Sequence, residues 1–396
     1  MKSRPRIKVL GSRHCFNHIA DSEHFLLSLA PMDTVIALDT GTNKGSHSPA
    51  VTISGGMSYG HLCPYLHEQG FALHNLASLP QISVAGACAA ATHGSGENNG
   101  NLATAVSGLE MVTADGEVIN VSRRANPDDF RAMVVGLGCF GAITKLTLDL
   151  QPAFPMRQSV YENLPFNNLV DNFDAIQASG YSVSLFTDWQ KQKIDQVWIK
   201  SLIQGGEDVK EPAPAFFGAK LATRNLHPIN GFSAENCTEQ MGVPGPWHER
   251  LPHFRIGVFP SAGDELQSEY FVPRHHAVEA ILAVERLRDE IPPHLLVTEI
   301  RAVAADDLWV SPCYKRSSIA IHFTWKQDWK AVKRLLPLIE RELAPFFARP
   351  HWGKLFTMPA SRLKPLYEKL PEFVQLSQRC DPMGKFRNNF LNTYVF

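Results

Sequence analysis

Leu10-Gly11-Ser12-Arg13-His14-Cys15-Phe16, near the start of the chain, is a glycine-containing turn that also carries a histidine. It follows a short apolar stretch, Ile7–Leu10, which predicts a β-strand. Glycine lets backbone N–H groups approach a ligand closely, and successive N–H groups in such a turn form a concavity that suits a pyrophosphate. Most Gly-Ser turns are only turns, and a lone histidine is more often structural than reactive. The rest of the chain must therefore decide what this turn does.

The composition is that of an ordinary globular chain. Its 396 residues are 44% hydrophobic and 19% charged, with a formal net charge of -1, so we expect two or three domains and an ample core. A net charge near zero gives no electrostatic basis for binding nucleic acid or an anionic membrane. No apolar run can span a bilayer and no signal region is seen, so we expect a cytoplasmic protein, acting as a monomer. The seven scattered cysteines contain no Cys-x-x-Cys pair, which predicts buried, reduced thiols and no metal site.

A second small-residue segment lies further along the chain. Every residue over 85–91 is small, and Thr92-His93-Gly94-Ser95-Gly96 follows as another glycine-rich turn. Small side chains let a backbone press closely against a neighbouring element or against a flat ligand, and the segment alone does not separate these alternatives. Later, Asp115-Gly116 between two apolar stretches predicts a tight β-hairpin.

The stretch Gly136-Leu137-Gly138-Cys139-Phe140-Gly141 matches the dinucleotide fingerprint G-x-G-x-x-G literally. A genuine fingerprint follows a strand and opens a helix. Here the stretch follows a helix predicted over 126–135 and opens an alternating strand predicted over 142–150. The order of elements is reversed, so we reject a nicotinamide site at this place.

The second half begins near Gln151, where the composition changes and we place a domain boundary. Residues 201–246 are rich in Gly, Pro and polar residues and predict a long loop region. Two later strands, 295–303 and 319–325, alternate so that each directs polar side chains to one face: Glu299, Arg301, His322 and Thr324. Spacing alone favours a solvated Glu–Arg pair on a sheet surface over a shared cavity. A cationic and aromatic cluster over 349–354 is either a structured turn or the lining of a polar pocket.

Seven stretches together resemble the alditol (xylitol) oxidases of the vanillyl-alcohol-oxidase-type FAD-linked superfamily, and the resemblance covers nearly the whole chain. They are 9–16, 77–86, 92–96, 236–254, 299–301, 322–325 and 351–354. The string Asn-Cys-Thr-Glu-Gln-Met-Gly-Val-Pro-Gly-Pro-Trp-His-Glu-Arg-Leu-Pro-His-Phe over 236–254 and the spaced C-terminal motifs are its specific part. Aldonolactone oxidases share the first turn and a His-Trp-Gly-Lys motif, so these two alone do not separate the families.

The resemblance implies an α+β fold with two domains. The FAD-binding domain would occupy 1–150 and the substrate domain 151–365, with a sheet covering the flavin, and 366–396 would return to the FAD-binding domain. The implied cofactor is FAD, bonded covalently through His14. The positions that match FAD contacts are Val9, Leu10, Gly11, Ser12, Arg13, His14, Cys15, Ser78, Ser83, Gly86, Ala90, Ala91, Thr92, His93, Ile143, Thr324 and His351.

The same resemblance implies a reaction and a pocket. A terminal CH–OH of an alditol such as xylitol or sorbitol would be oxidised to the aldose, and oxygen reduced to hydrogen peroxide. The matching pocket positions are Ser78, Glu299, Arg301, Thr324 and Lys354. Arg301 and Lys354 would stabilise a developing alkoxide, while the others would hydrogen-bond hydroxyls. We assign catalytic roles to Arg301, Lys354, His351 and Glu299; the base stays open, with His351 a candidate because imidazole titrates near neutrality.

Two features depart from the family pattern. The family turn reads Gly-Ser-Gly-His-Ser, whereas Arg13 and Cys15 replace its second glycine and last serine here. If the glycine position needs a positive φ, Arg13 strains it by about 1 kcal/mol; its charge can instead pair with the pyrophosphate. Family members also carry a further strand–helix unit before this turn, and we expect its loss to weaken FAD binding or stability.

Three functions follow as alternatives. The first is an FAD-dependent alditol oxidase. The second is an aldonolactone or other carbohydrate oxidoreductase on the same scaffold, and the third is a degenerate flavoprotein without activity. Turnover of alditols, turnover of lactones only, or failure to bind FAD would separate them.

Overall fold

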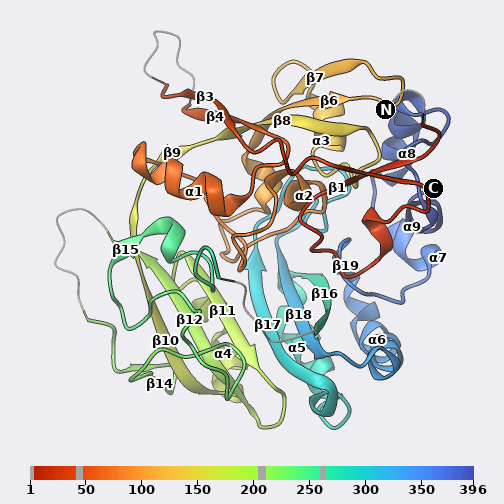
Figure 1. The fold of residues 1–396 in the computed structure, drawn as a ribbon. Coiled ribbons are helices and arrows are strands. Elements are labelled where there is room, and N and C mark those ends of the chain that lie inside the picture. Colours follow the sequence, from red (N-terminus) through yellow and green to blue (C-terminus); the bar gives the residue numbers. More distant parts are fainter. Residues whose placement is uncertain (1–3, 42–47, 204–210, 259–264) are drawn as a thin grey trace.

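The computed structural model describes residues 4–41, 48–203, 211–258 and 265–396. In the described part of the chain a five-stranded sheet lies at the top of Figure 1, and a ten-stranded sheet lies below it. Part of the loop region predicted over 201–246, namely 204–210, lies outside the described residues. No helix among the described residues is long and apolar enough to cross a membrane.

The five-stranded sheet is antiparallel throughout. Its strands, in spatial order, are β3 (Val35–Asp39), β4 (Ala50–Ser54), β8 (Ala142–Asp149), β6 (Val106–Val112) and β7 (Val118–Ser122). The predicted hairpin joins β6 to β7, and Gly116 at its turn has a φ of 90°. Strand β8 begins directly after Gly141, so the rejected fingerprint does open a strand rather than a helix.

Helices from both ends of the chain pack against this sheet. They are α1 (Tyr59–Glu68), α2 (Val84–Ala89), α3 (Pro127–Met133), α7 (Ala360–Leu363), α8 (Leu370–Cys380) and α9 (Asn389–Tyr394). Phe373 of α8 and Leu391 of α9 share one apolar core with Val51 of β4. Beside them β1 (Ile7–Leu10) pairs in parallel with β2 (Phe25–Ser28), and the Ile7 N–H donates to the Lys385 carbonyl at 2.9 Å. The C-terminal segment therefore completes the first half of the molecule.

The ten-stranded sheet is also antiparallel. Along its path lie β13 (Ala215–Phe216), β14 (Ala219–Leu221), β10 (Pro155–Pro165), β12 (Lys193–Leu202), β11 (Ser182–Thr187), β17 (Leu295–Val303), β18 (Ser318–Lys326), β16 (Glu265–Pro273) and β19 (Arg349–Pro350), with β15 (Gly245–Pro246) beside β10. One face packs on α4 (Phe166–Gln177), α5 (Ala277–Glu285) and α6 (Trp329–Leu343). Ile300, Ile321 and Phe323 lie in that core, so the alternating residues Glu299, Arg301, His322 and Thr324 lie on the opposite face.

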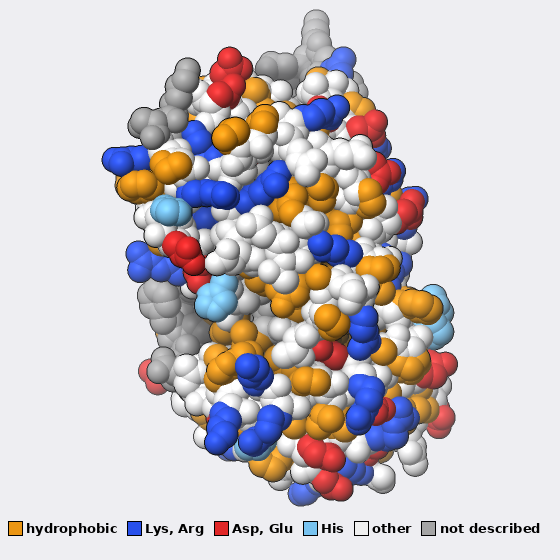
Figure 2. Space-filling view, turned by 90° about the vertical axis from the view of Figure 1, so that its right-hand side faces the viewer, with side chains coloured by type: hydrophobic (Ala, Val, Ile, Leu, Met, Phe, Trp, Pro, Cys, Tyr) orange, Lys and Arg blue, Asp and Glu red, His pale blue; other side chains and the backbone are white. Residues whose placement is uncertain are grey.

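The two halves are joined by several contacts. β5 (Phe71–Ala72) pairs with β9 (Gln151–Pro152), and the Gly96 N–H donates to the Ala302 carbonyl at 2.9 Å. Basic, acidic and apolar side chains are interspersed over the face seen in Figure 2, in keeping with a net charge of -1. Five cysteines are buried as expected, whereas Cys15 is exposed. The domain limits at 150 and 365 stay a prediction.

Candidate active site

The first turn and the small-residue helix α2 face one another. The Ser83 N–H, just before α2, donates to Ser12 Oγ at 3.1 Å. A Cβ placed on either Gly11 or Gly86 would lie 2.7 Å from Ser83 Oγ, and both glycines are exposed. Ser83 Oγ itself is buried and has no hydrogen-bond partner in the described part of the chain. A cradle that side chains would fill, with an unsatisfied hydroxyl beside it, fits the pyrophosphate and ribose of FAD.

Arg13 occupies the turn in a left-handed conformation. Its φ is 59°, a region that L-residues with a Cβ adopt only at a steric cost. The family pattern has glycine at this position, and glycine adopts a positive φ without steric cost. The positive φ of Arg13 is therefore the condition under which we expect strain. Gly11 to Cys15 are all exposed, so the turn lies where a ligand can reach it.

The turn is bonded to the C-terminal cluster 351–354. The Phe16 N–H donates to the Gly353 carbonyl at 2.8 Å, and Asn17 Nδ2 donates to the Trp352 and Lys354 carbonyls at 2.7 Å each. Although the His14 ring is open on one side, surrounding protein lowers its pKa, and the charge of Lys354 lowers the pKa further. His14 thus lies within electrostatic reach of a residue assigned to the substrate pocket.

The other predicted FAD positions lie beyond α2 and at the neighbouring sheet. Ala90 and Ala91 are buried at the end of α2, where Ala91 has a φ of 55°, and His93 is buried beside the ten-stranded sheet. A Cβ on Gly55 would lie 2.0 Å from the carbonyl oxygen of Ile143. Among the small residues over 85–91, Ala85, Ala87 and Cys88 lie in the apolar core, and the Ala89 carbonyl accepts from the Leu137 N–H at 3.1 Å. These residues therefore pack against protein, while Gly86 borders the cradle.

Glu269 of β16 lies at the centre of the polar face. It is fully buried and accepts hydrogen bonds from Arg301 Nη2 at 2.7 Å, Lys354 Nζ at 2.7 Å and His93 Nε2 at 3.1 Å. Burial by itself raises the pKa of Glu269, but the charges of Lys354, His93 and Arg301 outweigh it and hold that pKa well below its usual range. Glu269 is therefore an ionised counter-charge for the two cations that the sequence assigned to catalysis.

Lys354 also orients the pair formed by His322 and Thr324. Its ammonium, 2.8 Å from His322 Nδ1, can only donate, so Nδ1 accepts and the proton lies on Nε2. His322 Nε2 is 3.0 Å from Thr324 Oγ1 and therefore donates to it. Burial and then the Lys354 charge lower the pKa of His322 well below its ordinary value, in agreement with a neutral ring.

Glu299 and Arg301 lie on the same polar face of β17. Each is 5% exposed, which overturns the expectation of a solvated surface pair, because other segments pack on this face, with His253 against Glu299 and Glu269 against Arg301. Arg301 Nε lies 3.5 Å from Glu299 Oε2 but makes no hydrogen bond in the described part of the chain. Burial alone would lower the pKa of Arg301, but Glu299 and Glu269 together raise it, so it stays charged. A buried cationic donor is left available for a ligand.

His351 and Ser78 are linked to these residues from other segments by backbone hydrogen bonds. The His351 N–H donates to the Glu269 carbonyl at 2.9 Å, and the Gly353 N–H donates to His351 Nδ1 at 3.0 Å. Nδ1 is an acceptor, so the neutral ring carries its proton on Nε2; burial, then the Lys354 charge, lower its pKa. The Ser78 carbonyl accepts from the His253 and Phe254 N–H groups at 3.2 and 3.3 Å, which ties Ser78 to the segment behind Glu299.

The structure adds residues to which the sequence analysis gave no role. Glu269 lies in a strand whose polar alternation, Gln267 and Glu269 against Ser268 and Tyr270, was a signal of the same kind as Glu299 and Arg301. His253 stands in the string that carried the resemblance, but nothing local indicates its partner. Lys200 appears only as one residue of a strand, and its burial depends on contacts distant in sequence.

Comparisons with known proteins agree with this geometry. A family described as an FAD binding domain matches residues 2–122, and one described as D-arabinono-1,4-lactone oxidase matches 263–394. An alditol oxidase of a Streptomyces species is 46% identical over 96% of this chain and 88% of its own length. The L-gulonolactone oxidase of Mus musculus is 26% identical over 99% of this chain and 90% of its own length.

A solved structure is similar over almost the whole chain. A cholesterol oxidase from B. sterolicum superimposes with a TM-score of 0.75 at 14% identity, covering 99% of this chain and 90% of that one. At this identity the likeness concerns the fold alone. It confirms the predicted α+β fold with an FAD-binding part and a second part that contains a large sheet.

Proposed function

The chain belongs to the alditol oxidase family of the vanillyl-alcohol-oxidase-type FAD-linked oxidases, and we propose on this basis that it oxidises a terminal CH–OH of alditols such as xylitol or sorbitol. The product would be the aldose, and oxygen would be reduced to hydrogen peroxide. The observation that carries the proposal is the set Glu299, Arg301, Thr324 and Lys354, which three segments bring together. The first three are buried and Lys354 is half-buried.

The side chains divide the work as follows. Bound FAD supplies the hydride acceptor, which is the difficult part of the chemistry. Arg301 and Lys354 stabilise the oxygen of the alcohol as it loses its proton, since both present positive charge, buried at Arg301 and half-buried at Lys354. Glu299 accepts, and Thr324 accepts or donates, hydrogen bonds with further hydroxyls, which orients the terminal carbon. His351 Nε2 carries a proton, so its geometry suits a hydrogen-bond donor better than the base.

His14 is the proposed covalent attachment point of FAD. It lies in the same exposed turn as Gly11 and within electrostatic reach of Lys354. Acid precipitation of the purified protein should leave the yellow colour in the pellet. A His14→Ala variant should release the colour, whereas His18→Ala should not, because His18 pairs with Asp21 nearby in an exposed position. Free flavin in the wild-type supernatant would contradict the tether.

The activity is tested by peroxide release from xylitol and sorbitol, with L-gulono-1,4-lactone as the competing substrate. The lactone alternative has its own support, because the matched family over 263–394 is described as a lactone oxidase. Turnover of the lactone alone would replace the proposal with that alternative, and a colourless protein that cannot take up FAD would favour the inactive one. The cytoplasmic location and the monomeric state stay predictions; light scattering after size exclusion measures the latter.

A further inference from the structure

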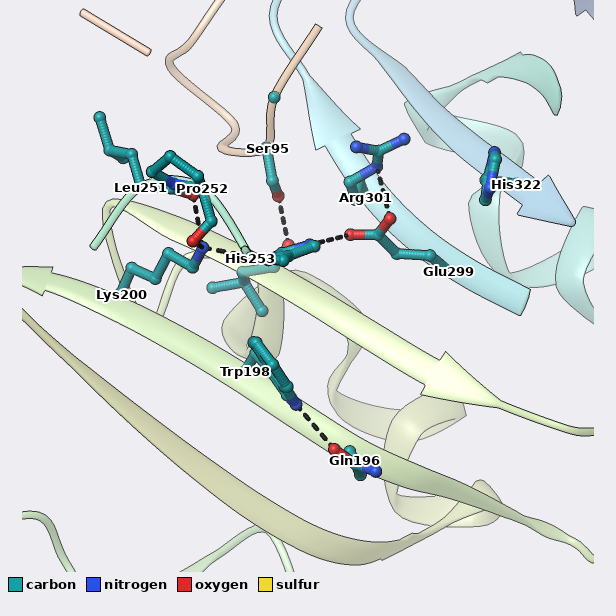
Figure 3. Close-up of polar contacts among 12 residues, drawn as sticks. Ser95, Gln196, Trp198, Lys200, Leu251, Pro252, His253, Glu299, Arg301 and His322 are labelled. Atoms are coloured by element: carbon teal, nitrogen blue, oxygen red, sulfur yellow. Dashed lines mark hydrogen bonds and ion pairs between the residues drawn. The ribbon is translucent and has the colours of Figure 1, made fainter. Parts of the chain in front are cut away.

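A buried lysine lies behind the pocket without touching it. Lys200 of β12 is 1% exposed, and Figure 3 shows it beneath the segment that contains Leu251, Pro252 and His253. Its ammonium donates to the Leu251 carbonyl at 2.5 Å, to the Pro252 carbonyl at 3.1 Å and to His253 Nδ1 at 3.1 Å. Three N–H groups thus meet three acceptors, so a protonated Lys200 is fully satisfied here.

His253 connects Lys200 to the pocket through two hydrogen bonds, one from its ring and one from its backbone. Because Nδ1 accepts from the lysine, the ring proton lies on Nε2, which donates to Glu299 Oε1 at 2.8 Å (Figure 3). The ring is held edge-on by Trp198 and Phe186, with centroids 5.2 and 5.5 Å away. The backbone N–H of His253 donates to the Ser78 carbonyl at 3.2 Å. His253 therefore contacts Glu299 through its side chain and Ser78 through its backbone, where the Phe254 N–H donates to the same carbonyl at 3.3 Å.

Arg301 is held independently of this arrangement. Its Nη2 hydrogen bond to Glu269 is 2.7 Å long, whereas its Nε lies 3.5 Å from Glu299. The cations of the pocket are thus aligned by Glu269, and Glu299 is aligned from behind by His253. A disturbance of His253 should reach Glu299 without displacing Arg301 or Lys354.

We propose that Lys200 and His253 are positioning residues, which hold Glu299 and Ser78 where they meet the hydroxyls of the polyol. The inference rests on the proposed function. Burial of an ammonium costs free energy that an apolar side chain would not, so packing alone does not account for a lysine at this place. Burial and then the Lys200 charge lower the pKa of His253 to about 4, which keeps the ring neutral and its single proton directed at Glu299.

The test compares removal with conservative replacement. Lys200→Met and His253→Leu should each raise the KM for xylitol about tenfold, because a hydrogen bond to a charged group is lost. The kcat should change less than about twofold, since binding is weakened in the ground state and the transition state alike. Lys200→Arg restores a cation and His253→Gln restores an N–H donor, so both should regain most of the wild-type KM.

Ser268→Ala is the matched control. Ser268 is fully buried in the same sheet and accepts from Trp325 Nε1 at 2.9 Å, next to Glu269 in the strand but on its opposite face. This variant should unfold at a lower temperature with an unchanged KM, and FAD content is measured for every variant. Unchanged KM values in Lys200→Met and His253→Leu, or no rescue by His253→Gln, would overturn the inference while wild-type turnover upholds the function. Absence of polyol turnover in the wild type would remove both.

Discussion

The proposed flavin cradle and the polar face of the large sheet differ in the kind of surface that they offer to a ligand. The cradle is made of exposed backbone and small residues, with Gly11 facing Gly86 and no ion pair between them. The polar face is made of buried charges, and Glu269 alone accepts from Arg301, Lys354 and His93. One region excludes side chains, whereas the other depends on them.

The difference fits the two ligands that we propose for these regions. A pyrophosphate brings its own charge, so close N–H groups and free space are enough to bind it. An uncharged polyol offers only hydroxyls, which are distinguished by polar groups fixed in position. Buried polar groups keep their position only when each has a partner, and this requirement explains the network around Glu269 and Glu299. The following experiments should therefore affect the two regions differently.

The largest effect is expected at the centre of the network. Glu269→Ala would leave Arg301 and Lys354 buried without their main counter-charge, and should lower the free energy of unfolding by about 3–5 kcal/mol. Urea denaturation measures this free energy. Ser268→Ala is the control: it loses one neutral hydrogen bond and should lower the free energy of unfolding by about 1 kcal/mol. Equal losses in the two variants would show that Glu269 is not the counter-charge.

A side chain in the cradle should affect the cofactor more than the fold. In Gly86→Val the new atoms enter the space beside Ser83 and Gly11, and a steric cost of about 1–3 kcal/mol weakens FAD binding roughly tenfold to a hundredfold. Flavin absorbance per protein measures it. Gly108→Val is the control, because a Cβ there meets Thr147 at an ordinary 3.6 Å. Full flavin content in Gly86→Val would argue against the cradle.

Polyol binding in the pocket, unlike FAD binding in the cradle, should weaken at mildly alkaline pH. Burial lowers the pKa of Lys200 to about 7. The charge of Glu299 opposes this shift by raising the pKa, the charge of Arg301 lowers it further, and Cys237 raises it. The Lys200 ammonium is also in contact with His253. The three-fold anchoring is complete below this pKa and is lost as the pH rises through it, because the amine then has two N–H groups for three acceptors. The KM for xylitol should rise several-fold from about pH 6 to about pH 8.5.

Lys200→Arg separates this effect from other titrations. A guanidinium keeps its charge throughout this range, so the KM of the variant should be flat. The same rise in the variant and in the wild type would assign the pH dependence to another group.

The smallest effect is expected in the turn itself. Arg13→Gly removes a Cβ from a residue with a φ of 59°, and should raise the free energy of unfolding by up to about 1 kcal/mol. Arg13→Ala keeps the Cβ, so its free energy of unfolding should not rise. If both variants bind FAD more weakly, the arginine charge contributes to the pyrophosphate site; a larger gain in Arg13→Ala would contradict the strain.

Local sequence patterns were enough to predict several strands and a hairpin of the fold. The alternation over 295–303 and 319–325 placed Glu299, Arg301, His322 and Thr324 on one face, because side chains of a strand point to opposite sides in turn. Asp115-Gly116 located a hairpin for a similar local reason. The resemblance named the residues of the pocket, and their proximity is a property of the structure, whereas their roles stay proposals.

The sequence by itself determined the strands, their polar faces and the family of the chain, because periodicity and motifs are carried by neighbouring residues. Only the tertiary structure decided that the polar face is buried, since this depends on which distant segments pack against it. The same holds for Glu269 and for Lys200 and His253, whose partners come from separate segments. From the strand pattern alone, a charged residue is predicted to face solvent. Only the packing of other segments on the sheet shows that it is buried and which residue is its counter-charge.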